Sequence, residues 1–94
     1  MKKYFISKRV VEQAERMKDK ILYFISELDY KLETNNITLE KYRTKRNALQ
    51  SEYEKVNNAL NSLTCEGYSL KGTWNNIQIL KEYAIQRDIM DSML

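Results

Sequence analysis

The residues whose types could support chemistry gather in one short stretch, residues 62–76, which reads SLTCEGYSLKGTWNN. It holds the only cysteine, both glycines and the only tryptophan of the chain. A thiol such as that of Cys65 becomes a nucleophile when a neighbouring base or cation lowers its pKa. The chain has no histidine, which excludes a Cys–His pair and histidine metal ligands. We therefore expect Cys65 to be a small, half-buried apolar side chain in a corner between two helices.

Other motifs of catalytic or metal-binding proteins are absent or incomplete. A single cysteine excludes the usual zinc patterns. The segment GYSLKG has two glycines five residues apart but lacks the Lys-Ser/Thr that follows in a phosphate-binding loop. Glu12, Glu15 and Asp19 would point away from the apolar side of their helix, among basic residues, which is typical of a solvated surface. We therefore expect a non-enzymatic protein with no catalytic residue, metal site, cofactor or small-molecule substrate.

The composition is that of one domain built from long helices. The 94 residues include no proline and only two glycines, so few positions interrupt a helix. A chain of this length fits a single domain, residues 1–94. No apolar run approaches the roughly 20 residues of a membrane span, and one cysteine forms no internal disulfide, so we expect a cytoplasmic protein. Lys, Asn, Ile and Tyr, which have AT-rich codons, are abundant and suggest that the protein is encoded by a low-GC bacterium or by one of its phages or plasmids.

The apolar periodicity predicts a long helical hairpin. Apolar residues three and four apart over residues 4–33 indicate one amphipathic helix. A second helix is expected over residues 38–64, with Thr38 as its N-cap and apolar residues at heptad a and d positions. The short polar connection TNN, residues 34–36, favours two antiparallel helices side by side. The first stripe comprises Val10, Ala14, Met17, Ile21, Ile25, Leu28 and Leu32. The second comprises Leu39, Tyr42, Leu49, Tyr53, Val56, Leu60 and Leu63, with Arg46 at the remaining a position.

A third helix is expected over residues 73–93, capped by Thr73. Gly67 suits the left-handed residue just beyond the end of the second helix, and residues 68–70 would then cross the end of the hairpin. The predicted fold is all-α: a long antiparallel hairpin with a C-terminal helix against it, as a three-helix bundle or a coiled-coil-like assembly.

The C-terminal helix has apolar residues on two sides. One broad side can close the hairpin, and a second apolar stripe lies about 100° or more away, where packing on a hairpin would leave it exposed. Phe5, Tyr23 and Tyr30 form an outer aromatic row on the first helix. We expect a small regulator, inhibitor, adaptor or assembly chaperone that binds another protein or itself as a homo-oligomer. Its expected contact residues are Trp74, Ile85, Ile89 and Met93, with Tyr23 and Tyr30 as outer contacts.

Basic residues give an alternative function. Residues 1–20 carry seven Lys/Arg against three Asp/Glu, and the segment KYRTKR, residues 41–46, carries four positive charges in two turns. Cations at the start of a helix are mildly unfavourable, so they could serve phosphate contacts in a nucleic-acid-associated regulator. The net charge of only +3 makes this the second choice. Its expected residues are Lys2, Arg9, Arg16, Lys20, Lys41, Arg43, Lys45 and Arg46.

Overall fold

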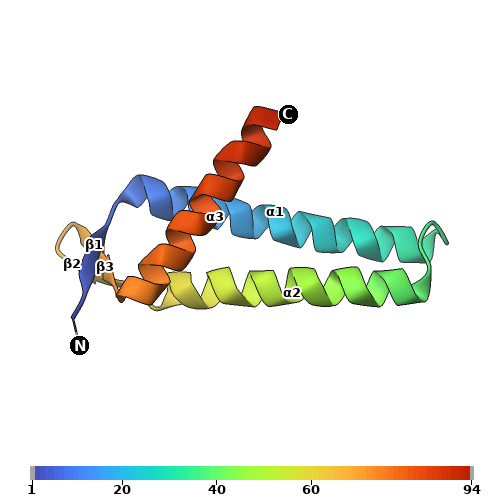
Figure 1. Cartoon of the computed structure of the whole chain (residues 1–94), viewed down its shortest axis with the longest axis horizontal. Coiled ribbons are helices and arrows are strands. Elements are labelled where there is room, and N and C mark those ends of the chain that lie inside the picture. The colour runs from blue at the N-terminus through green and yellow to red at the C-terminus, as the bar shows by residue number, and fades with distance from the viewer. Residues whose placement is uncertain (1, 94) are drawn as a thin grey trace.

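The chain forms a three-helix fold with a small sheet at one end. A computed structural model gives the backbone of residues 2–93 and the side chains of residues 2–89. The element order is β1 (Tyr4–Ile6), α1 (Lys8–Glu33), α2 (Leu39–Asn61), β2 (Thr64–Glu66), β3 (Ser69–Gly72) and α3 (Trp74–Met93). Figure 1 shows α1 and α2 as a long antiparallel hairpin and α3 crossing it steeply near the sheet. The predicted all-α architecture of a hairpin with a packed C-terminal helix is confirmed.

Side-chain caps fix where the helices begin. The Ser7 hydroxyl accepts a hydrogen bond from the Val10 amide at 3.2 Å. The Thr38 hydroxyl accepts one from the Lys41 amide at 3.3 Å. The Thr73 hydroxyl accepts one from the Asn76 amide at 3.4 Å. Each bond satisfies an amide that has no partner inside its own helix. The caps expected at Thr38 and Thr73 are therefore present.

The sheet is the main departure from the sequence prediction. Residues 4–6 were expected to begin the first helix, but they form β1, and Ser7 starts the helix instead. The expected corner is a β-hairpin: β2 and β3 pair antiparallel, and β1 adds antiparallel to β3 in the order β1-β3-β2. Gly67 does adopt a left-handed conformation, with φ 63°, but within this hairpin turn. A three-residue strand paired across more than sixty residues leaves too short a local pattern to be recognised.

The core lies where α3 crosses the hairpin. Val56 and Ala59 of α2 meet the buried stripe of α1, and Ile77, Leu80 and Tyr83 of α3 close over both. Two features of the predicted stripes differ from expectation. Val11 is buried more deeply than Val10, and Leu39 is exposed at the turn end of the hairpin. The buried stripe of α1 consists of Val11, Ala14, Met17, Ile21, Ile25 and Leu28.

The polar a position at Arg46 belongs to a network at the turn end of the hairpin. The Tyr42 hydroxyl donates a hydrogen bond to Asp29 at 2.6 Å, and the Arg46 guanidinium lies 3.8 Å from the same carboxylate. This network joins α2 to α1 at one level along the hairpin, which favours a single register.

Tyr83 predicts an alkaline loss of stability. Its ring is buried and its hydroxyl donates to Glu52; burial and the Glu52 carboxylate raise the pKa of Tyr83 above its ordinary 10.0. The folded chain therefore keeps a proton that the unfolded chain releases near pH 10. The contribution to stability is complete below that pH and is lost as the pH rises above it.

Denaturant unfolding between about pH 9 and pH 11 measures this effect. The wild type should lose stability more steeply than Tyr83→Phe, which has no hydroxyl to titrate. At neutral pH the same substitution should lower the free energy of unfolding by about 1 kcal/mol, for the lost hydrogen bond. Parallel pH profiles for the two proteins would contradict the assignment.

Candidate protein-docking surface

One side of α3 carries large apolar side chains that remain more than half exposed. Trp74 is 57% exposed, Ile85 is 59% exposed and Ile89 is 54% exposed. At about 100° per residue these three residues share one side of the helix, opposite the buried Leu80 and Tyr83. We call Trp74, Ile85 and Ile89 the outer face of α3. The exposure expected from the sequence for these three residues is present; the side chain of Met93 lies outside the described residues.

The outer face packs against β1 at its first residue and projects from the hairpin at its last. The Trp74 ring packs edge-on against Tyr4 of β1, with ring centroids 5.4 Å apart and an interplanar angle of 68°. Gln13 of α1 donates a hydrogen bond to Asp88 at 2.9 Å, which ties α3 to α1. Figure 1 shows the C-terminal part of α3 continuing past α1, beyond the hairpin. The apolar side chains of the outer face are therefore accessible, with the exposed Gln78 and Lys81 between Trp74 and Ile85 on the same side.

A second apolar surface lies between α1 and α2 in the half of the hairpin farther from the sheet. It is an open groove of about 360 Å³ lined by Phe24, Leu28, Ala48 and Leu49. Glu27, Lys31 and Lys45 complete its lining and supply its charge. We call this surface the distal groove. This groove was not predicted from the sequence.

The distal groove continues the apolar surface of α1 and α2 on which α3 already packs. On α1, Met17 and Ile21 lie in the core that α3 covers, and Phe24 and Leu28 follow on the same side of that helix. On α2, Val56 lies in that core and Leu49 precedes it by two turns. Because α3 crosses the hairpin steeply (Figure 1), it covers only the part of this apolar surface near the sheet. The remainder stays open.

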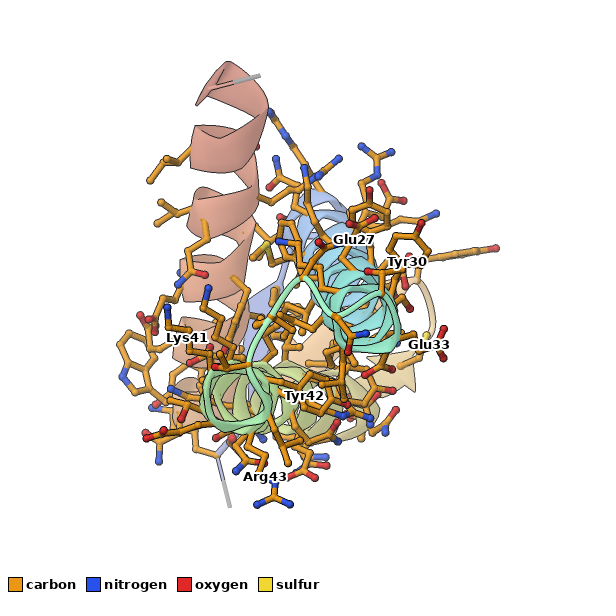
Figure 2. The ribbon with its side chains drawn as sticks, turned by 90° about the vertical axis from the view of Figure 1, so that its right-hand side faces the viewer. Glu27, Tyr30, Glu33, Lys41, Tyr42 and Arg43 are labelled. Carbon is orange, nitrogen blue, oxygen red and sulfur yellow. The ribbon has the colours of Figure 1, made fainter. Side chains whose placement is uncertain are left out.

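The two tyrosines expected as outer contacts do not share the outer face of α3. Tyr23 and Tyr30 are exposed on α1. In the view along the hairpin from its turn, Tyr30 points away from α3 (Figure 2). Phe5, expected in the same row, lies on β1, where Lys71 sits over its ring at 4.8 Å. These aromatic residues are therefore dispersed over separate parts of the surface.

The basic residues fall into separate groups. Arg9, Arg16 and Lys20 follow one flank of α1, whereas Lys2 precedes β1 and lies 5.7 Å from the centre of the Tyr4 ring. Lys41, Arg43, Lys45 and Arg46 lie at the turn end of α2. Arg43 points away from both α1 and α3 in Figure 2.

The separation is large because the hairpin is long. The bond from Tyr42 to Asp29 places the start of α2 beside the end of α1. Asp29 is twenty residues beyond Arg9, or about 30 Å along the helix. The eight basic residues do not form one continuous patch.

Cys65 differs from its expected environment. It is exposed on β2 rather than half-buried, and its thiol donates a hydrogen bond to the Gly67 carbonyl at 3.3 Å. β2 is an edge strand of the small sheet, so the backbone groups on one of its two edges have no neighbouring strand in the described part of the chain. Among the described residues, no three His, Cys, Asp or Glu side chains come together as metal ligands could.

Comparison with protein-family models, with curated proteins and with solved structures finds no match to this chain. Over the part of the chain that is described, no helix combines the length and the apolar character needed to cross a lipid bilayer. What the chain binds must therefore be inferred from the surfaces of the molecule itself.

Proposed function

We propose that the chain is a small protein–protein interaction module that docks through the outer face of α3 and carries out no chemistry. The observation that supports this is the exposure of Ile85 and Ile89, both more than half exposed on a helix that buries Leu80 and Tyr83 on its opposite side. Roles consistent with such a module are those of a regulator, an inhibitor, an adaptor or an assembly chaperone, encoded by a phage or plasmid and acting in the cytoplasm.

The geometry of α3 supports docking in physical terms. Burying an isoleucine side chain completely stabilises by about 1.5–3 kcal/mol. Since Ile85 and Ile89 are about half exposed, covering both would contribute about 2 kcal/mol, and Trp74 adds a large aromatic surface. Tryptophan is enriched among the residues that dominate binding energy. The fixed position of Trp74 against Tyr4 limits the entropy lost on binding.

Site-specific photo-crosslinking tests the proposal. A photoreactive phenylalanine analogue replaces Ile85 in the full chain, and the adducts formed in extracts of the source cells are resolved by mass. The matched control carries the same analogue at Leu39, which is also about half exposed but lies at the turn end of the hairpin. We expect a discrete adduct from position 85 only, and its loss when Ile89→Asp is added to the same chain. Equal adducts from both positions, no adduct at all, or an adduct that survives Ile89→Asp would overturn the proposal.

A further inference from the structure

We propose that the occupant of the outer face of α3 is the distal groove of a second copy of this chain. In the resulting dimer, the two hairpins run in opposite directions, and the sides that carry α3 face each other. Both α3 helices then lie between the hairpins. Each α3 packs on its own hairpin through its buried side and on the partner hairpin through its outer face. This inference rests on the docking function proposed above and names its partner.

The first support is that the two open surfaces complement each other in shape. The outer face of α3 is one side of a single helix, and the distal groove lies between two helices. The molecule already contains this kind of contact, because the buried side of α3 packs across the same two helices nearer the sheet. A second α3 in the distal groove would repeat that contact farther along the hairpin.

The second support is the position of the two surfaces. Both lie on the side of the hairpin that α3 crosses, one near the sheet and one toward the turn. A two-fold axis near the middle of the hairpin, parallel to this side, exchanges the sheet end with the turn end and brings the two sides face to face. Each outer face then meets the partner's groove, so one symmetric contact covers both pairs of open surfaces. Two-fold dimers, in which the same patch serves both copies, are the commonest oligomers.

The third support is charge. Lys31 and Lys45 line the distal groove and form no ion pair with any described residue. Glu82 and Lys81 are both exposed on α3 about one turn before Ile85, on the side of the outer face. Glu27 lies beside the two lysines of the groove, so each surface carries charges of both signs and can pair with the other. A carboxylate beside the lysines of the partner would fix the orientation of the two copies more than it would raise their affinity. A small domain also gains stability from such association, since a chain of this length buries a limited core.

The experiment measures the solution molar mass of the purified full chain by sedimentation over a wide dilution range. Ala48→Arg places a long charged side chain in the groove at an exposed helix position. Ser51→Arg is the matched control, one turn away on α2, exposed and absent from the groove lining. We expect a dimer for the wild type and Ser51→Arg. Ala48→Arg should weaken dimerisation by at least about 100-fold, because the symmetry removes the contact twice.

A second measurement covers the case in which Ala48→Arg acts by disturbing the fold. The photoreactive analogue at position 85 is activated in the purified wild-type background, and the adduct is mapped by mass spectrometry. The inference requires a linkage between two copies that falls within residues 24–31 or 45–49. A linkage from α3 to α3, or a dimer that Ala48→Arg leaves intact, would overturn it.

The failures of the two proposals can be told apart. A chain that stays monomeric at every concentration, but whose position 85 crosslinks a different protein in extracts, overturns the second-copy inference and leaves the docking function standing. A monomer without any adduct from position 85 overturns both.

Discussion

Leu80→Ala should lower the free energy of unfolding by about 3–4 kcal/mol, within the range measured for fully buried leucines. Leu80 is 0% exposed and lies in the core that α3 shares with both helices of the hairpin. Its loss leaves a cavity at the place where α3 is held. For a domain whose total stability is of the order of 5–15 kcal/mol, this is a large fraction.

The matched control is Ile85→Ala, which shortens a side chain of similar size on the outer face of the same helix. Because Ile85 is more than half exposed, this substitution should cost less than about 1 kcal/mol in the monomer. Denaturant unfolding at a concentration where the chain is monomeric measures both. Similar losses for the two substitutions would mean that α3 is packed in a different orientation.

The second large effect concerns docking. The double substitution Ile85→Asp and Ile89→Asp should weaken association by at least about 100-fold, since two apolar contacts are lost and two charges would have to be desolvated. The monomer should keep its helical content and its unfolding free energy to within about 1 kcal/mol, because both positions are exposed on the surface.

Tyr30→Asp serves as the comparison for this pair. Tyr30 is also a large exposed residue, but it points away from α3 (Figure 2). Sedimentation equilibrium should show unchanged association for Tyr30→Asp. Association that is weakened equally by Tyr30→Asp would show that the contact extends over α1 and is not centred on α3.

Local patterns predicted the helices well because a helix is specified by residues close in sequence. The stripe of Ala14, Met17 and Ile21 and the caps at Thr38 and Thr73 needed no knowledge of the rest of the chain. The two apolar sides of α3 could also be predicted from the sequence, since they follow from the angle between successive residues. The exposed face of α3 was therefore predictable as soon as one side was assigned to the hairpin.

Features that depend on distant contacts were missed. Tyr4–Ile6 form a strand because β3, more than sixty residues later, offers hydrogen-bonding partners, with Tyr4 opposite Gly72. The distal groove depends on where α3 crosses the hairpin and at what inclination (Figure 1). Nothing in the local sequence sets either quantity. One signal was present: Leu28 and Leu49 continue the apolar stripes toward the turn, farther along the hairpin than a steeply crossing helix covers.

The fluorescence of Trp74 tests most directly whether a second copy covers the outer face of α3. It is the only tryptophan of the chain and belongs to that face, so quenching of its emission by iodide reports exposure at the contact itself. We predict that quenching in the wild type increases on dilution as dimers separate. Quenching in Ala48→Arg should be high at every concentration. Equal, concentration-independent quenching in both proteins would contradict the account.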